Sequence, residues 1–305
     1  MSKQSQLTAA LQIENIPFTC GEVLAGHTTL RIGGPADWFV RPADAAGLCF
    51  VIAQCRAFDI PYYLLGNGSN ILFGDAGYRG AVIDLSAMTP AISCQLDGDD
   101  TLVTVSAGCS LGKLCIFARD RALTGLEFAY GIPGTVGGAV YMNAGAYGGE
   151  VKDVLEKATV LQADGTTAVL PAAALGLAYR HSALEDNGGC VLDATFRLKA
   201  GDRDAISAKM NELMGRRRDK QPLDKPSAGS TFKRPEGAFA AALIDQCGLR
   251  GYQVGGAAIS EKHCGFAVNL GGATCADFEA LCAQVSAIVK EKTGYTLEKE
   301  IRVVK

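Results

Sequence analysis

The stretch GLEFAYGIPGTVGGAVYMNAGAYGGE, residues Gly125–Glu150, is the most informative part of the chain. Its glycines lie among apolar and small residues, which is not the composition of a Ser- and Pro-rich linker. Backbone without side chains can approach a phosphate or a flat ring closely, and consecutive N–H groups can face an anion. A shorter segment of this kind, LGNGSNILF, covers Leu65–Phe73. Two such segments predict one extended ligand with a diphosphate, held at two points.

Both glycine segments also have interpretations that need no ligand. The pair Asn67-Gly68 is common in tight turns between strands. Glycines in residues 131–145 could serve the close packing of a helix against a sheet. This second segment lacks both the GxGxxG order of a dinucleotide fingerprint and the GK[ST] of a P-loop. Packing alone explains it less well, because its glycines are many and closely spaced.

The overall composition is that of an ordinary globular protein. The chain has 305 residues, a net charge of -3 and 48% hydrophobic residues, which is enough for two or three domains. This charge does not favour nucleic acid as a partner. The N-terminus lacks the apolar core of a signal peptide, and no window of 18 apolar residues exists. We therefore expect a cytoplasmic monomer that binds neither nucleic acid nor membrane.

The cysteines and histidines do not predict a metal site. The 11 cysteines include no CxxC pair, so we expect reduced thiols, most of them buried as small hydrophobic side chains. His27, His181 and His263 lie far apart in the sequence, and none has a ligand-like spacing to a cysteine.

The order of predicted elements favours the α+β class, because helices and strands are intermixed without strict alternation. We expect a helical segment over residues 1–26, a βαβ-like unit up to residue 86 and a hairpin around Asp164-Gly165. A change of composition near Gly201 marks a domain boundary. The expected domains are 1–86 and 87–200, which together bind the ligand, and 201–305, with a C-terminal strand in 296–305 that can pack near the first domain.

The pentapeptide GCSLG, residues 108–112, matches the G-x-S-x-G pattern of a hydrolase nucleophile elbow. Ser110 would then be the nucleophile, with His263 and Asp245 as partners. However, the preceding strand TLVTVSAG alternates polar and apolar residues, whereas the central strand of an α/β-hydrolase is apolar on both faces. We therefore favour Ser110 as the N-cap of the next helix.

Seven motifs in order resemble those of the UDP-N-acetylenolpyruvoylglucosamine reductase family, whose members are also called UDP-N-acetylmuramate dehydrogenases. The resemblance extends from about Thr28 to Arg302, nearly the whole chain. The motifs are TLRIGGPAD, LLGNGSNIL, GIPGTVGGAVYMNAGAYG, YRHS, AGSTFKRPEG, LRGYQVGGAAIS and LEKEIR. Together they are far more specific than any one of them.

The resemblance implies a flavoenzyme with non-covalent FAD and with NADPH as co-substrate. It implies a vanillyl-alcohol-oxidase-type fold, in which two α+β subdomains hold FAD and a C-terminal domain binds substrate. The implied reaction reduces UDP-N-acetylglucosamine enolpyruvate to UDP-N-acetylmuramate in peptidoglycan precursor synthesis, and so serves cell-wall formation, cell shape and cell division.

The resemblance also assigns residues. Ser230 is the implied proton donor, and Arg180 and Glu300 are implied to stabilise or help protonate the enolate. Four basic residues are implied to face the substrate: Arg216, Lys220, Lys233 and Arg234. The implied FAD contacts are Gly66, Asn67, Gly68, Ser69, Asn70, Ile132, Pro133, Gly134, Thr135, Gly137, Gly138, Asn143 and Gly145.

The chain departs from the family pattern in places. It resembles the shorter subtype, which lacks a tyrosine loop over the substrate. Arg234 stands where some members carry Asn, and His27 stands near a more usual Asn. Two further alternatives stay open: another flavoenzyme of the same superfamily, such as a sugar or alcohol oxidase, and a non-catalytic nucleotide-binding protein.

Overall fold

The computed structural model describes residues 3–305, which form two compact units. The first unit contains residues 3–19, 39–67 and 80–216. The second unit contains residues 20–38, 68–79 and 217–305. Each unit is therefore assembled from segments that are distant in sequence. The three-domain division at residues 86 and 200 stays a prediction.

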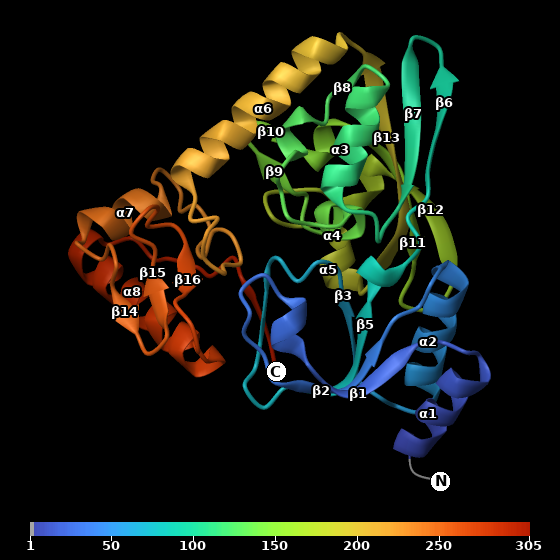
Figure 1. The fold of residues 1–305 in the computed structure, drawn as a ribbon, viewed down its shortest axis with the longest axis horizontal. Helices are drawn as coiled ribbons and strands as arrows, with labels where there is room; N and C mark the ends of the chain where they lie inside the picture. The colour runs from blue at the N-terminus through green and yellow to red at the C-terminus, as the bar shows by residue number, and fades with distance from the viewer. Residues whose placement is uncertain (1–2) are drawn as a thin grey trace. The chain divides into compact units, whose positions relative to one another are not determined.

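A six-stranded sheet organises the first unit, with β8 beside β13 and the other strands in the order β12-β11-β13-β7-β6. Its strands are β6 (Ile92–Asp97), β7 (Asp100–Ser106), β8 (Leu123–Thr124), β11 (Leu155–Leu161), β12 (Thr167–Pro171) and β13 (Cys190–Ala200). The long strand β13 lies between β7 and β11 and pairs antiparallel with both (Figure 1). The expected hairpin around Asp164-Gly165 is confirmed by the antiparallel pair β11 and β12.

Helices α3 (Leu111–Asp120) and α4 (Val136–Tyr141) contribute to the core of this unit. Their apolar residues Leu114 and Val140 share one buried cluster with Val105 of β7 and Phe196 of β13. α3 begins at Ser110, whose hydroxyl accepts a hydrogen bond from the Lys113 N–H at 3.3 Å. The predicted N-cap is thus confirmed.

A four-stranded sheet has the order β1-β2-β5-β3, with β3 and β5 parallel. Its strands are β1 (Phe18–Val23), β2 (Pro35–Val40), β3 (Tyr62–Leu65) and β5 (Tyr78–Asp84). The expected helical segment over residues 1–26 is partly wrong, because helix α1 (Lys3–Ile13) ends early and β1 follows. The sequence FTCGEV has no helical apolar periodicity, and glycine at position 21 adopts φ +69°.

The structure contains further helices, short strands and 3-10 turns. They are α2 (Ala45–Ala57), α5 (Ala183–Asn187), α6 (Arg203–Lys220), β9 (Gly145–Ala146), β10 (Gly149–Glu150) and the 3-10 turns Leu24–His27, Leu85–Ala87, Glu127–Ala129, Val151–Asp153 and Ala172–Leu175. Helix α6 is rich in charged residues and runs as one long helix in Figure 1.

The second unit contains α7 (Ala240–Gln246), α8 (Cys275–Thr293) and two small sheets. One sheet is antiparallel and has the order β14 (Gln253–Val254), β15 (Ala257–Ile259), β16 (Ala267–Asn269). The other is a parallel pair of β4 (Ile71–Phe73) and β17 (Arg302–Val304). The predicted C-terminal strand is therefore present but limited to three residues.

Helix α8 is held at its N-terminus by two carboxylates. Thr274 and Asp277 form a capping box, in which each side chain accepts from the other residue's backbone N–H. Asp75 accepts from the next two free donors, the N–H groups of Cys275 at 2.7 Å and Ala276 at 3.0 Å. A carboxylate at a helix N-terminus satisfies open donors and interacts favourably with the helix dipole.

Most of the cysteines are part of the buried core. Eight of the 11 cysteines are buried, so most are packed as small hydrophobic residues, as predicted. Burial raises the pKa of Cys55, Cys115 and Cys190 to about 12, which keeps these thiols protonated. Within residues 3–305, no helix combines the length and the apolar character that crossing a membrane requires.

We predict that Asp75→Ala lowers the free energy of unfolding by about 1 kcal/mol, because α8 loses two capping hydrogen bonds. Asp75→Asn keeps one acceptor oxygen, so its free energy of unfolding should lie between those of the unmodified protein and Asp75→Ala. The measurement is denaturant unfolding. Asp59→Ala is the matched control, since the Asp59 side chain is 92% exposed and pairs with Lys3 at the surface. Equal stability of the two alanine variants would contradict the capping role.

Candidate active site

The second glycine segment starts α4, and the protein itself uses the backbone donors there. Thr135 Oγ1 accepts from the Gly138 N–H at 3.3 Å. The N–H groups of Val136 and Gly137 donate to Cys109 O at 2.8 Å and to Ala107 O at 2.9 Å. The expectation that these donors face an anion is therefore wrong for the first turn of α4. They tie the helix to the end of β7 instead.

The glycines of this segment fall into two groups. A Cβ on buried Gly137 would lie 2.9 Å from the Ala107 Cβ, and one on Gly149 would lie 2.8 Å from the Phe128 ring. Packing within the protein requires glycine at these positions. A Cβ on Gly134 or Gly138 would approach nothing closer than 3.7 Å or 3.4 Å, respectively. Packing does not require glycine at these two positions, which leaves their surface open to a ligand.

The first half of GNGSN lies against the second glycine segment, within the first unit. A Cβ on Gly66 would come within 2.6 Å of Thr135 Oγ1. The Asn67 side chain donates from Nδ2 to Pro133 O at 2.8 Å. The two segments predicted to hold one ligand are thus in direct contact at these residues.

The second half of GNGSN belongs to the second unit and offers backbone donors. Gly68 has φ +59°, and a Cβ there would lie 2.1 Å from His27 O, so only glycine fits. Its carbonyl accepts from the Thr29 N–H at 3.2 Å. In the described residues 3–305, no hydrogen bond inside either unit uses the N–H groups of Asn67, Gly68 or Ser69. Such donors suit a diphosphate, so this loop fits an anionic cofactor.

Asn70 joins this loop to the last strand of the chain. Its side chain donates from Nδ2 to Glu300 O at 3.1 Å, and its own carbonyl accepts from the Arg302 N–H at 3.1 Å. The parallel pair β4 and β17 continues this contact, with Ile71 opposite Arg302. The backbone of Glu300 is therefore fixed directly to the first glycine segment.

Ser230 and Glu300 lie on neighbouring segments of the second unit. The Glu300 N–H donates to Thr231 O at 2.9 Å, and Phe232 and Lys299 form an antiparallel bridge. Thr231 is fully buried, and its hydroxyl accepts from the Ala267 N–H at 2.7 Å. The residue after Ser230 is thus anchored on both sides, while Ser230 itself is only half-buried.

Arg180 lies in the first unit, at the tip of a tight turn. Ala178 and His181 exchange two backbone hydrogen bonds of 3.0 Å and 3.2 Å. Arg180 adopts φ +54°, which is uncommon for a residue other than glycine. Its Nη2 donates to Gly145 O at 3.3 Å, and its guanidinium carbon lies 5.3 Å from the centre of the Tyr179 ring.

The four predicted substrate-facing cations are exposed. Arg216 pairs with Glu212 on α6 at 2.6 Å, and Lys233 Nζ lies 3.7 Å from a Glu298 oxygen. The guanidinium of Arg234 stacks on Phe239, 4.5 Å from the ring centre. These contacts are typical of solvated surface residues, and a role in substrate binding stays a prediction.

Arg217 was missed by the sequence analysis, although it is only 7% exposed. Its Nη1 donates to Gln221 at 3.3 Å. A signal for its burial was present in the spacing, because it follows the buried positions Ile206, Met210 and Leu213 along one helix face. The run of three arginines concealed this pattern.

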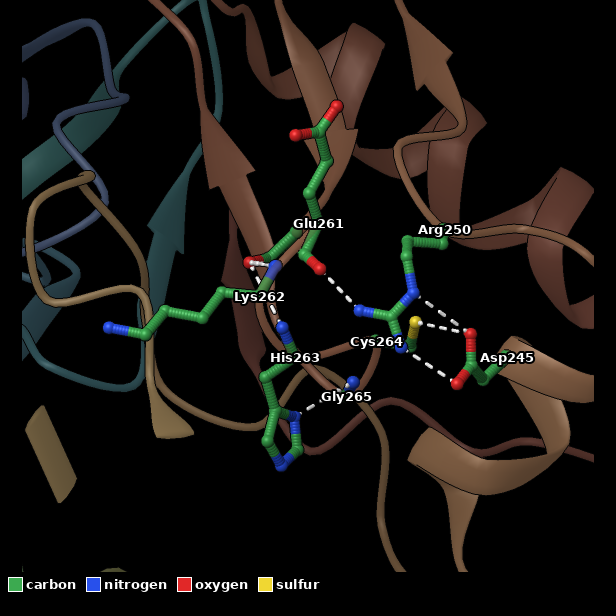
Figure 2. Close-up of polar contacts among 8 residues, drawn as sticks. Asp245, Arg250, Glu261, Lys262, His263, Cys264 and Gly265 are labelled. Atoms are coloured by element: carbon green, nitrogen blue, oxygen red, sulfur yellow. Dashed lines mark hydrogen bonds and ion pairs between the residues drawn. The ribbon is translucent and has the colours of Figure 1, made fainter. Parts of the chain in front are cut away.

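The residues proposed as hydrolase partners are engaged elsewhere. Asp245 binds Arg250 through two contacts of 3.0 Å and 2.7 Å, and the Cys264 thiol donates to it at 3.4 Å. The Gly265 N–H donates to His263 Nδ1 at 3.1 Å. Figure 2 shows the Asp245 carboxylate facing Arg250 and the His263 ring facing Gly265. Asp245 therefore does not orient His263 as a triad requires, and the hydrolase interpretation is wrong.

The surroundings of His263 also disfavour the charged form of its ring. Burial lowers the pKa of His263, and the nearby charges of Arg250 and Lys220 lower it further. His27 is engaged differently, with Nε2 2.8 Å from a Glu22 oxygen. Within residues 3–305, no group of three or more His, Cys, Asp or Glu side chains is arranged to hold a metal ion.

Comparison with known proteins gives consistent matches. Residues 221–304 match the family model of the UDP-N-acetylenolpyruvoylglucosamine reductase C-terminal domain, and residues 36–170 match that of an FAD binding domain. The chain is 49% identical to UDP-N-acetylenolpyruvoylglucosamine reductase of Lachnoclostridium phytofermentans over 94% of this chain and 92% of the relative. It is 44% identical to the UDP-N-acetylenolpyruvoylglucosamine reductase of Limosilactobacillus fermentum, over 96% of this chain and 99% of that relative.

A solved structure agrees with these sequences. The crystal structure of UDP-N-acetylenolpyruvylglucosamine reductase from Thermus caldophilus matches with a TM-score of 0.77 and 36% identity, covering 95% of this chain and 99% of that one. The α+β class and the FAD-binding fold predicted from the sequence are thereby confirmed.

Two neighbouring glycines of α4 allow a test of the glycine segment. We predict that Gly137→Ala destabilises the apoprotein by about 1–3 kcal/mol, because the new methyl group meets Ala107. Gly138→Ala should leave stability unchanged or raise it by up to ~1 kcal/mol. It should nevertheless weaken FAD binding, because its methyl group enters the open surface. The measurements are denaturant unfolding and FAD titration by flavin fluorescence.

Gly112→Ala is the control for this pair, since α3 leaves open space around Gly112. It should gain helix stability without loss of FAD affinity. If Gly138→Ala binds FAD as tightly as the unmodified protein, Gly138 does not face the cofactor.

Proposed function

Because the chain belongs to the UDP-N-acetylenolpyruvoylglucosamine reductase family, we propose that Ser230, Glu300 and Arg180 carry out the family's reaction in this protein. The chain is an FAD-containing oxidoreductase of peptidoglycan synthesis, with NADPH as the reductant. The substrate is UDP-N-acetylglucosamine enolpyruvate and the product is UDP-N-acetylmuramate.

One observation supports the catalytic assignment most strongly. A series of hydrogen bonds to backbone groups joins the first glycine segment to Glu300 and to the neighbour of Ser230 within the second unit. Asn70 holds Glu300, and Glu300 in turn holds Thr231, the neighbour of Ser230. These hydrogen bonds, 2.9 Å to 3.1 Å long, thus connect three distant segments of the sequence. Each segment contains a residue that the family resemblance assigns to the site.

The loop residues fit the cofactor that the family requires. The open N–H groups of Asn67, Gly68 and Ser69 would bind the FAD diphosphate, and the surface at Gly134 and Gly138 would accept its neighbouring groups. These are non-covalent contacts. When bound, FAD would pass hydride from NADPH to the terminal methylene carbon of the enolpyruvyl group.

The chain's own residues would then stabilise a negative charge and donate a proton. Addition of hydride leaves enolate character beside the substrate carboxylate, and the adjacent carbon must be protonated. We assign the proton to the hydroxyl of Ser230. A serine hydroxyl is a weak acid, so it can act only when it is held against a strongly basic carbon. The anchored Thr231 provides this restraint.

Glu300 and Arg180 complete the proposed set. The guanidinium of Arg180 would stabilise the negative charge of the enolate, as a cation does at developing charge in a transition state. Glu300, with its backbone held by Asn70 and Thr231, would assist the proton transfer. Arg216, Lys220, Lys233 and Arg234 would attract the substrate's diphosphate and carboxylate.

We also propose that the enzyme works in the cytoplasm as a monomer, without nucleic acid or membrane. Its small net charge of -3 and its 11 cysteines without paired spacing support this proposal. Measurement of the molecular mass in solution tests the oligomeric state.

We predict that Ser230→Ala separates the two halves of the catalytic cycle. The flavin should still be bleached by NADPH under anaerobic conditions. Its reoxidation by UDP-N-acetylglucosamine enolpyruvate should slow by about 10²–10³-fold, because the proton donor is missing. Stopped-flow absorbance of the flavin measures both steps.

Ser227→Ala is the control in the same loop, because Ser227 takes part through its backbone carbonyl, which accepts from Thr29 Oγ1 at 2.7 Å. Both half-reactions should be normal in that variant. If Ser230→Ala reoxidises at the normal rate, Ser230 is not the proton donor. If oxygen reoxidises the unmodified protein as fast as the substrate does, the protein is an oxidase instead.

A further inference from the structure

Asn143 is fully buried between α4 and β9, in the left-handed backbone region with φ +40°. Its side chain makes three hydrogen bonds to three different places. Nδ2 donates to Glu150 Oε2 at 2.7 Å and to Ala178 O at 3.0 Å, and Oδ1 accepts from the Lys152 N–H at 2.9 Å. A buried amide with this many partners fixes the segments around it.

These contacts leave Asn143 without a donor for a cofactor. A side-chain amide has two N–H groups, and both are used within the protein. The prediction that Asn143 contacts FAD therefore has no support from its amide donors. Its carbonyl partner is informative instead, because Ala178 begins the turn that carries Arg180.

The Arg180 turn, residues 178–182, is attached to residues 141–145 at three points. Ser182 Oγ donates to Tyr141 O at 2.7 Å, Asn143 donates to Ala178 O, and Arg180 donates to Gly145 O. Alternate residues of one segment thus hold the two ends and the tip of the turn. In two of these contacts residues 141–145 contribute a backbone carbonyl. In the third they contribute a side chain, that of Asn143.

Glu150 orients the amide of Asn143. Its carboxylate accepts from Asn143 Nδ2, and its other oxygen lies 2.5 Å from Lys152 Nζ. Because the carboxylate can only accept, it requires the N–H side of the amide to point toward it. The same orientation directs the second N–H to Ala178 O. Glu150 thus selects the rotamer that holds the turn.

We propose that Asn143, oriented by Glu150, is the positioning residue for Arg180. The inference rests on the proposed role of Arg180 in stabilising the enolate. Arg180 has an uncommon backbone conformation, which persists only if its surroundings hold it. A shift of about 1 Å in a catalytic group can slow a reaction by about 10²-fold.

Asn143→Asp tests this inference with almost no change of size. Aspartate tolerates the left-handed region, so the backbone need not move. The substitution replaces Nδ2, which carries both donors, with an oxygen that accepts. This oxygen faces two other acceptors, the Glu150 carboxylate and Ala178 O. Reoxidation by UDP-N-acetylglucosamine enolpyruvate should slow by about 10²-fold, with FAD content and reduction by NADPH unchanged. Trypsin should also cut the holoenzyme faster after Arg180.

The paired variant Asn143→Asp/Glu150→Gln isolates the contact with Ala178. The new amide at position 150 can donate to the new carboxylate, so the bond between these two positions returns with reversed polarity. The bond to Ala178 O does not return. Thermal stability should therefore recover, while slow reoxidation and fast cleavage after Arg180 persist. If Asn143→Asp alone does not fold, this variant carries the test.

Thr195→Val is the control for a general loss of stability in the first unit. It removes a buried hydroxyl that lies 2.9 Å from Thr104 Oγ1, on strands β13 and β7. It should lower the unfolding temperature without slowing reoxidation or exposing the Arg180–His181 bond to trypsin.

Three results would overturn the inference: a paired variant with normal reoxidation, an unchanged rate of trypsin cleavage, or a reduction by NADPH that slows as much as reoxidation. Arg180→Ala separates the two proposals. Normal reoxidation of Arg180→Ala would refute the role of Arg180 and the inference with it. Slow reoxidation of Arg180→Ala beside normal reoxidation of Asn143→Asp would refute the positioning role alone. In an Arg180→Ala background, Asn143→Asp should slow reoxidation no further.

Discussion

The contact between Asn70 and the last strand is the constraint on which the second unit depends. Asn70 binds Glu300 and Arg302 through two hydrogen bonds, although 230 residues separate it from Glu300. The pairing of β4 with β17 sets the register of this contact. Since side chains alternate along a strand, a slip of one residue would turn each of them to the opposite face. The glycine loop and the proposed acid groups are therefore positioned by one short ladder.

The glycine segments serve the fold and the ligand at different positions. Gly68 and Gly137 are required by close contacts within the protein, whereas Gly138 is not. Glycine is therefore present for two separate reasons, close packing at some positions and an open surface at others. Sequence alone does not distinguish them, because the difference lies in what faces each Cβ. A glycine-rich sequence motif in this protein is partly a packing motif and partly a binding surface.

Much of the fold was predictable from local patterns, and the failures have local causes. The hairpin at Asp164-Gly165 and the helix start at Ser110 follow directly from turn chemistry and capping preference. Strand β1 was missed because its six residues are half-exposed and carry no clear period. The site required family resemblance, since Ser230 and Glu300 lie far apart in the sequence and their segments are joined only by tertiary contacts. The role of Asn143 depends on residues 150 and 178, which no local pattern connects.

The parallel pairing of β4 with β17 also determines when the second unit can form. Its paired residues Ile71 and Arg302 lie 231 residues apart in the chain. The first unit ends at residue 216 and can complete its sheet earlier. Contacts between distant parts of a sequence form slowly even in a released chain. During synthesis the first unit can therefore fold before the second unit, which cannot complete its parallel pair until residues 302–304 are available.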